Sequence, residues 1–277
     1  MANPDNRLGP HNTPQPSPAS GEVAVKSTGR ALKPKDAATL VLVDRSQGEP
    51  RVLMGRRQST QVFLPNKFVF PGGRVDRGDR TMVALTELSA ADQEWLLRDM
   101  KGPPSAARIR ALALAAVRET FEEAGLIVGT RLPEPRSPEP LQAPQSAKPD
   151  AKLHAAKSPP RPTHKSWQQF LATGYLPSLS ELTFFARAIT PPARPRRYDT
   201  RFFLADASAV AHNSENCDDE LRDLGWFTLD EIRALELPNI TRAIVEDLAQ
   251  RLDQPDRNHP IPYYRFERGS FRRDLIT

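Results

Sequence analysis

Three glutamates stand close together near the end of a stretch with a helix-forming composition. The segment AAVRETFEEAGL holds Glu119, Glu122 and Glu123 beside Arg118, and it stops at Gly125. A helix turns about 100° per residue, so positions three and four apart share one face. Like charges repel on such a face, and the C-terminal end of a helix disfavours negative charge. A hard divalent cation, Mg2+ or Mn2+, would resolve this conflict, because it takes carboxylate oxygens and bridges them to a phosphate.

An ordinary acidic helix face is the alternative interpretation of the same residues. Glu122 lies four residues after Arg118, a spacing at which the two side chains form an ion pair on a solvated helix. Taken alone, the cluster favours this alternative. The residues that precede the helix decide between the two.

A glycine pair and an acidic loop precede the helix, in the segment FPGGRVDRGD (70–79). With them, the cluster resembles the Nudix box, written G-x5-E-x7-R-E-U-x-E-E-x-G-U, in which U is a bulky aliphatic residue. Gly73 takes the first place of the pattern. The later places are taken by Arg118, Glu119, Glu122, Glu123, Gly125 and Leu126.

The match to the box has two substitutions and one insertion. Asp79 stands where the pattern has Glu, and Thr120 stands where it has an aliphatic residue. The 38 residues from 80 to 117 separate Asp79 from Arg118, where the pattern has seven, so about 31 are inserted. Residues 54–79 and 182–207 are similar to the Nudix branch that includes peroxisomal coenzyme A diphosphatases, which carries an extension at this point.

The resemblance implies a fold, an activity and a set of roles. The fold is α+β, the Nudix fold, with a mixed sheet between helices. The activity is metal-dependent hydrolysis of a nucleoside diphosphate linked to another moiety. By the match, the three glutamates are metal ligands, a backbone carbonyl at Gly72 reaches the metal, and Arg118 orients a carboxylate. Asp79 either supports the junction between loop and helix or binds nothing.

Two residues are candidates for the general base of the reaction. Glu119 is the first choice, and Glu220 is the second, because CDDELRDLGWF (217–227) places acids just ahead of an expected strand. A solvated loop carboxylate is the alternative for Glu220.

Four cations are candidates for binding the diphosphate or a 3′-phosphate, and each has a surface cation as its alternative. They are Arg56, Arg57, Lys67 and Arg201. Three aromatic side chains are candidates for stacking on a base, with core packing as the alternative for Phe68. They are Phe63, Phe68 and Tyr198.

Three functions remain open at this stage. The first is a diphosphatase of coenzyme A or acyl-coenzyme A, with a small-molecule nucleotide-diphosphate substrate. The second is a Nudix hydrolase of ADP-ribose or another nucleotide. The third is a non-catalytic Nudix binding module, against which the presence of all three helix glutamates argues.

The helices and strands that must position these residues are predicted from the spacing of apolar residues and from the turn and capping residues between them. Strands are expected over 37–44, 51–57 and 67–73. Helices are expected over 88–100, with Ser89 as its cap, and over 105–125, with Ser105 as cap and Gly125 as stop. Further on, we expect a helix over 166–174, strands over 181–190 and 199–207, a strand leading into a capped helix over 221–235, and a helix over 240–252.

Composition sets the domain limits. The chain has 277 residues, a mean hydropathy of −0.55 and 28 prolines, nine of them between 133 and 162. We therefore predict a disordered tail over 1–35, a Nudix domain over 36–255 and a tail over 256–277. Inside the domain, 80–107 is the box insertion and 129–163 a Pro-rich excursion.

The cysteine count, the hydrophobic pattern and the net charge limit the classes of partner and cofactor that the sequence predicts. One cysteine excludes disulfides and a cysteine-based zinc site within one chain. There is no signal peptide or membrane-spanning run, so a cytoplasmic protein without a membrane partner is expected. The net charge of +5 favours anionic ligands, but no DNA-reading motif accompanies it, so we do not expect nucleic acid. The sequence gives no oligomeric state.

Overall fold

The structure is a computed structural model, and it describes residues 32–98, 100–132, 164–214, 218, 220–254 and 260–276. Residues 1–31 of the expected N-terminal tail and most of the Pro-rich excursion lie outside these residues, whereas 32–35 are described and Lys35 begins a strand. No helix among the described residues has the length and apolar character needed to cross a bilayer.

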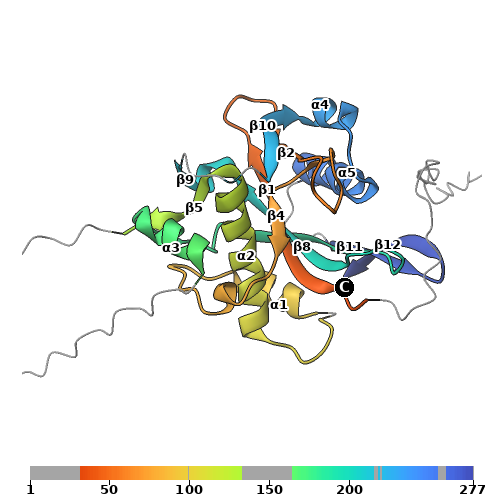
Figure 1. Ribbon diagram of the computed structural model, residues 1–277, viewed down its shortest axis with the longest axis horizontal. Helices are drawn as coiled ribbons and strands as arrows, with labels where there is room; N and C mark the ends of the chain where they lie inside the picture. Colours follow the sequence, from red (N-terminus) through yellow and green to blue (C-terminus); the bar gives the residue numbers. More distant parts are fainter. Residues whose placement is uncertain are drawn as a thin grey trace, which may run out of the picture.

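A large mixed sheet organises the chain (Figure 1). Its strands run in the order β10-β2-β1-β8-β7-β11-β12, with β3 paired to β2 and β4 paired to β1. The central pair, β1 and β8, is parallel, whereas β1 pairs with β2 and β4 in antiparallel fashion. The bounds are β1 Lys35–Asp44, β2 Arg51–Arg57, β3 Phe68–Val69, β4 Gly72–Arg74, β7 Thr183–Ile189, β8 Tyr198–Asp206, β10 Leu221–Thr228, β11 Ile261–Glu267 and β12 Ser270–Ile276.

A second, three-stranded sheet has the order β6-β5-β9. Its strands are β5 Leu126–Arg131, β6 Tyr175–Pro177 and β9 Val210–Asn213. The helices are α1 Ala90–Leu97, α2 Ala106–Ala124, α3 Lys165–Ala172, α4 Leu229–Ala234 and α5 Asn239–Asp253, with short 3-10 turns η1 Gly78–Arg80 and η2 Ala207–Ala209.

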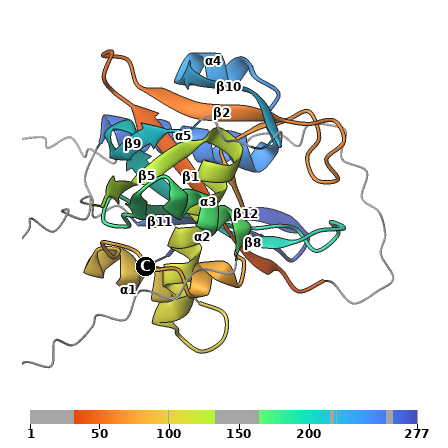
Figure 2. The same ribbon diagram turned by 60° about the vertical axis from the view of Figure 1, so that its left-hand side comes forward.

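Strand β1 is buried on both faces of the sheet. Its side chains alternate between two hydrophobic clusters, one on each face. Leu40 and Leu42 join the hydrophobic cluster that contains the apolar residues of α2. Val41 and Val43 point the other way and join the cluster of α5. Successive side chains of a strand face opposite sides, so one continuous apolar run serves two layers. Figures 1 and 2 show the result, with α2 and α5 on opposite sides of the sheet.

Helix α2 begins and ends at the predicted signals. The Ser105 hydroxyl accepts a hydrogen bond from the Arg108 N–H, which satisfies one free donor of the first turn. Gly125 ends the helix in the left-handed region, at a φ of 68°. A side chain there would also collide with the carbonyl of Ser214, 2.2 Å from the position of an added Cβ. The stop signal therefore has both a conformational and a steric reason.

Most predicted elements are confirmed, including the cap of α1 at Ser89 and the Thr228–Glu231 capping box of α4. The segment over 67–73 is two short strands rather than one. The start of the expected Pro-rich excursion belongs to β5, and β6 and β9 were not predicted. The region 256–277 contains a β-hairpin of β11 and β12 where a tail was expected, and β11 pairs in parallel with β7.

Candidate active site

Two of the three glutamates of α2, Glu119 and Glu123, meet the glycine turn at β4. The Gly72 N–H donates a hydrogen bond to Oε2 of Glu123 over 2.8 Å. The Glu119 carboxylate packs so closely on Gly73 that an added Cβ would lie 2.5 Å from its Oε1. The glycine pair is needed at this point because any side chain on residue 73 would displace the carboxylate.

Arg118 links two of the glutamates. Its Nη1 donates to Oε2 of Glu122 over 2.7 Å and forms an ion pair with Oε1 of Glu119 at 2.9 Å. Its Nη2 donates to the Arg74 carbonyl over 2.9 Å, which ties the helix to the end of β4. Arg118 thus contacts two carboxylates, and its role in orienting them stays a prediction.

Asp79 holds the other side of the Arg118 guanidinium. It accepts hydrogen bonds from Nε over 2.8 Å and from Nη2 over 3.1 Å. The Asp79 side chain is fully buried, and it also accepts from the indole N–H of Trp167 and from the Asp76 N–H. Of the two interpretations offered for Asp79, the geometry favours support of the junction between loop and helix. The shorter carboxylate reaches Arg118 in spite of the insertion.

Trp167 is the residue of this network that sequence reasoning missed. It lies on α3, 88 residues beyond Asp79, and it is fully buried. The rings of Phe121 and Phe170 pack edge to face at 5.3 Å and fix α3 against α2. The sequence signal was the apolar face of the expected helix over 166–174, which predicts burial but no partner for the indole.

Burial raises the pKa of two carboxyl groups in the glutamate cluster. Burial is the largest influence on Glu119 and raises its pKa to about 8, with Arg118 opposing and the charge of Glu122 adding to the rise. Burial followed by the charge of Glu119 raises the pKa of Glu123 well above its usual range. Burial works to lower the pKa of Arg118, but Asp79 and the glutamates outweigh it and hold that pKa above its ordinary value.

The alternative of a solvated acidic face does not fit this arrangement. The Arg118–Glu122 pair that it requires is present. However, Arg118 is only 3% exposed and Glu123 only 2%. Charged side chains are rarely buried to that extent on a helix without a specific partner or ligand.

Glu220 and Arg57 lie beside the glutamates. Nη2 of Arg57 donates to Oε1 of Glu220 over 2.8 Å, and its Nε donates to the Phe63 carbonyl over 2.9 Å. The charge of Glu220 contributes to the raised pKa of both Glu119 and Glu123. Glu220 is therefore an ion-paired neighbour of the cluster rather than an isolated loop carboxylate.

The other three candidate cations are engaged elsewhere. Arg56 pairs with Asp223 at 2.5 Å and Lys67 with Glu236 at 2.8 Å, both on the surface. Arg201 is buried in β8 at 1% exposure. In the described part of the chain, none of the three has a recorded contact with the glutamates of α2. Of the aromatic candidates, Phe68 packs on Phe227, and Phe63 packs edge to face on Tyr198.

The carboxylates do not converge on one point. Among the described residues, no three His, Cys, Asp or Glu side chains are grouped as metal ligands would be. Glu119 and Glu122 turn toward Arg118, and Glu123 turns toward Gly72. At Gly72, the recorded contact is made by the N–H, whereas the sequence predicted a role for the carbonyl.

Two curated proteins are similar to this chain in sequence. Acyl-coenzyme A diphosphatase NUDT19 of Gallus gallus is 27% identical over 200 residues, which are 63% of this chain and 53% of that protein. Putative nudix hydrolase 7 of Caenorhabditis elegans is 28% identical over 196 residues, 70% of this chain and 51% of that protein. The chain thus spans about half the length of the curated relatives that it matches. No family model matches the chain.

Solved structures similar to the chain include a NUDIX hydrolase from Alicyclobacillus acidocaldarius, with a TM-score of 0.49 and 26% identity over 77% of this chain and 90% of that one. The sequence relatives and the box residues together confirm the resemblance to the Nudix hydrolases, and the mixed sheet with helices on both sides is the α+β arrangement that this resemblance implies. Among those hydrolases, one of the named relatives is the acyl-coenzyme A diphosphatase of Gallus gallus.

Proposed function

We propose that the protein is a Nudix-type diphosphatase, which hydrolyses the diphosphate linkage of a nucleoside diphosphate joined to another moiety. One observation carries the proposal. Glu119 and Glu123 of α2 are held against the glycine turn of β4, and Glu122 pairs with a buried arginine, Arg118, that is itself fixed by Asp79. Such an excess of buried carboxylate is unfavourable for a structural role and suits the binding of a cation and a phosphate.

The residues of the cluster fit a divalent cation by their chemistry. Glu119, Glu122 and Glu123 would hold it, since they offer only hard oxygen donors, which suit Mg2+ or Mn2+. Burial, together with the charge of neighbouring carboxylates, raises the pKa of Glu119 and of Glu123, and a bound cation would favour their ionised forms. When bound, the ion would neutralise the charge that develops on the phosphoryl oxygens.

The chain's own groups would supply the rest of the reaction. In hydrolysis, a water oxygen attacks phosphorus, its proton passes to a base, and the bond from phosphorus to the bridging oxygen breaks. Glu119 remains the first choice of base, with Glu220 as the second. Arg118 would keep the carboxylates in place through its contacts with Glu119 and Glu122, and Asp79 would keep Arg118 in place.

Coenzyme A or acyl-coenzyme A is the substrate class that we propose, which would give 3′,5′-ADP and a phosphopantetheine product. Two observations support it. The named relative from Gallus gallus is an acyl-coenzyme A diphosphatase, and the box of this chain is interrupted between Asp79 and Arg118, as its resemblance to the coenzyme A branch implies. ADP-ribose and other nucleotides remain the alternative.

A substrate panel tests both levels of this proposal. The purified chain is incubated with coenzyme A, an acyl-coenzyme A, ADP-ribose and a dinucleoside polyphosphate, each with Mg2+, with Mn2+ and with a chelator. We expect turnover only with a metal, and the highest kcat/KM for one of the coenzyme A substrates. A tenfold or greater preference for ADP-ribose would reject the coenzyme A assignment. Absence of turnover on every substrate would reject the diphosphatase.

A further inference from the structure

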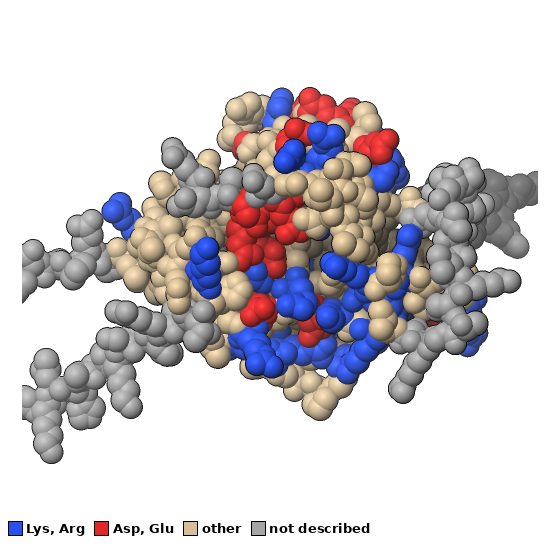
Figure 3. Space-filling view, in the orientation of Figure 1, with Lys and Arg blue, Asp and Glu red and all other residues tan. Residues whose placement is uncertain are grey.

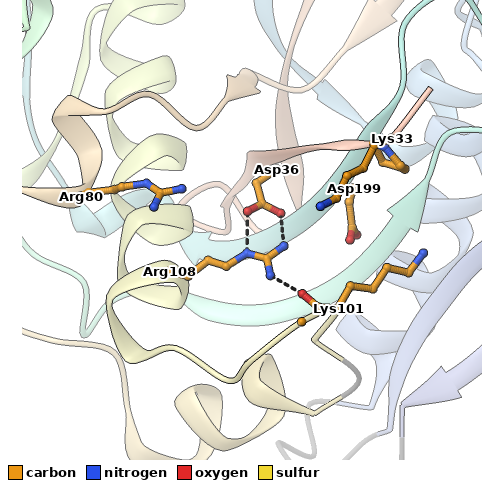
Figure 4. A pocket seen from close by; sticks show the side chains of 8 residues that line it. Lys33, Asp36, Arg80, Lys101, Arg108 and Asp199 are labelled. Carbon is orange, nitrogen blue, oxygen red and sulfur yellow. Dashed lines mark hydrogen bonds and ion pairs between the residues drawn. The ribbon is translucent and has the colours of Figure 1, made fainter.

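A second charged site lies toward the other end of α2. It is a pocket of about 330 Å3 at the beginning of β1, and basic side chains dominate its lining (Figure 4). The residues that matter here are Lys33, Asp36, Arg80, Lys101, Arg108 and Asp199, and we call this site the basic pocket. Figure 4 shows that its cations come from different segments: the start of the described chain, the turn η1, the loop before α2, and α2 itself.

The two carboxylates of the basic pocket are already engaged. Asp36 accepts from Nε and Nη2 of Arg108, both over 2.6 Å. Asp199 accepts two hydrogen bonds of 2.8 Å from Arg187 and also pairs with Arg201 at 2.9 Å. Three guanidinium groups therefore share two carboxylates, and the surroundings of the pocket keep a positive excess.

Arg201 shows that this excess reaches the buried layer next to the pocket. It is 1% exposed, and it contacts both acidic residues of the lining, Asp199 at 2.9 Å and Asp36 at 3.6 Å. Its Nη2 is buried, and within the described residues it has no hydrogen-bond partner. A buried donor of this kind is costly unless something accepts from it or its charge serves a ligand nearby.

The remaining cations of the lining are open to a ligand. Lys33, Arg80 and Lys101 are exposed, and no carboxylate among the described residues forms an ion pair with any of them. A neighbouring hollow of about 220 Å3 shares Lys101 and adds Arg197 and Arg265. Figure 3 shows basic side chains gathered on this face below an acidic patch.

We propose that the basic pocket binds a phosphate group. Arginine and lysine together are the side chains that recognise phosphate, because they supply charge and several N–H donors. A pocket of 330 Å3 also has the size of a small-molecule site, for which about 300–1,000 Å3 is usual. Its like-charged walls would raise the local concentration of an anion.

The basic pocket is separate from the glutamate cluster. Arg108 and Glu119 lie on the same helix, eleven residues apart. At 1.5 Å per residue, their backbones are about 16 Å apart along the helix axis. A single diphosphate group cannot contact both sites. The phosphate in the basic pocket is therefore either a more distant phosphate of the same substrate or part of a second molecule.

Binding of inorganic pyrophosphate tests the proposal without any assumption about the reaction. Isothermal titration calorimetry is done on the full chain with a chelator present, so that the acidic cluster repels the probe. We expect pyrophosphate to bind, with an affinity that falls as salt is raised. The double variant Arg80→Glu/Lys101→Glu should bind at least tenfold more weakly, and Arg80→Gln/Lys101→Gln should lie between it and the wild type.

Lys165→Glu is the matched control, because it reverses one exposed cation on α3, outside the lining of the basic pocket. It should leave pyrophosphate binding unchanged. No binding to the wild type at millimolar pyrophosphate would overturn the proposal, and so would equal binding by the wild type and the double variant. Circular dichroism of each variant shows whether it is folded, and the neutral pair provides the test if the charge-reversed pair is not.

A kinetic measurement then separates the two sources of the phosphate, and this part rests on the proposed function. Coenzyme A is compared with dephospho-coenzyme A, which lacks the 3′-phosphate. If the pocket takes that phosphate, the double variant raises KM for coenzyme A about tenfold and leaves dephospho-coenzyme A unaffected, with kcat preserved. If it takes a separate molecule, the two KM values change equally or not at all. Failure of both substrates to react would reject the proposed coenzyme A substrate class and leave the calorimetric result standing.

Discussion

The two ends of helix α2 solve the problem of surplus charge in opposite ways. Toward the C-terminus, three carboxylates (Asp79, Glu119 and Glu122) surround the single guanidinium of Arg118, a fourth (Glu123) accepts from the Gly72 N–H, and most of this charge is buried. Toward the N-terminus, Arg108 belongs to a set of cations that outnumbers its carboxylates, and the unpaired members are exposed. A buried surplus raises pKa values and costs stability, whereas an exposed surplus is screened by water and costs little.

The largest effect should come from removing the arginine at each end. Arg118→Met leaves the fully buried Asp79 without its cation, and loss of one partner of a buried pair costs about 3–5 kcal/mol of unfolding free energy. Arg108→Met breaks a bidentate pair with Asp36 that is partly open to water. It should cost less, about 1.5–3 kcal/mol. Urea denaturation at pH 7 with a chelator measures both.

Equal losses for the two methionine variants would contradict the contrast between a buried and an exposed surplus. A variant of a surface pair provides the baseline. Lys67→Ala removes the exposed contact with Glu236 and should change the unfolding free energy by no more than about 1 kcal/mol.

Removing one carboxylate charge from the glutamate cluster near the C-terminus of α2 should abolish most of the proposed hydrolase activity. Glu122→Gln and Glu123→Gln each keep the shape of the side chain and remove its negative charge, so each should lower kcat at least 100-fold on the preferred substrate. Glu94→Gln is the control, because Glu94 is an exposed glutamate of α1 that pairs with Arg98 four residues on. If both cluster variants turn over within twofold of the wild type, these carboxylates are not part of the catalytic site.

A smaller effect is expected in the dependence of stability on pH. The pKa of Glu119 is about 8 in the folded chain and about 4.5 when unfolded, so the folded state holds its proton more tightly. The stabilisation from that proton is complete below pH 4.5 and is lost as the pH rises toward 8. The Tm of the metal-free chain should fall over this window, by about 2–4 °C for each kcal/mol lost.

Glu119→Gln isolates this contribution from the other titrating groups. The variant should show a flatter pH profile of Tm than the wild type. Added Mg2+ should raise the Tm of the wild type at pH 8 more than at pH 5, because a cation favours the ionised carboxylates. Parallel profiles for the wild type and Glu119→Gln would contradict the assignment of a raised pKa to this residue.

The parts of the fold that sequence reasoning predicts are those encoded by neighbours along the chain. The limits of α2 follow from Ser105 and Gly125, and the capping box of α4 follows from Thr228 and Glu231. The hairpin β11–β12 could not be predicted in this way. The sequence of β12, SFRRDLI, has no apolar alternation, and the place of β11 in the sheet depends on β7, more than 70 residues earlier.

The same distinction holds in the candidate site: residues placed by their neighbours along the chain were predicted, and residues placed by distant strands were not. The grouping of Glu119, Glu122 and Glu123 near the end of α2 was predicted from helix spacing, and two of them, Glu119 and Glu123, lie against the glycine pair. The burial of Arg201 was not predicted. It lies directly opposite Arg187 in the β7–β8 pairing, and Asp199 between the two makes that pairing acceptable. Cross-strand pairs of this kind cannot be read from one strand alone.

The indole of Trp167 can serve as an intrinsic fluorescent probe of the glutamate cluster. Its N–H donates to the carboxylate that fixes Arg118, so we expect its emission to change when the glutamate cluster binds a cation. The other two tryptophans, Trp95 and Trp226, lie on α1 and β10, and replacing both with Phe leaves one fluorophore to observe. Titration of that variant with Mg2+ would follow cation capture directly, with no substrate or label in the cuvette.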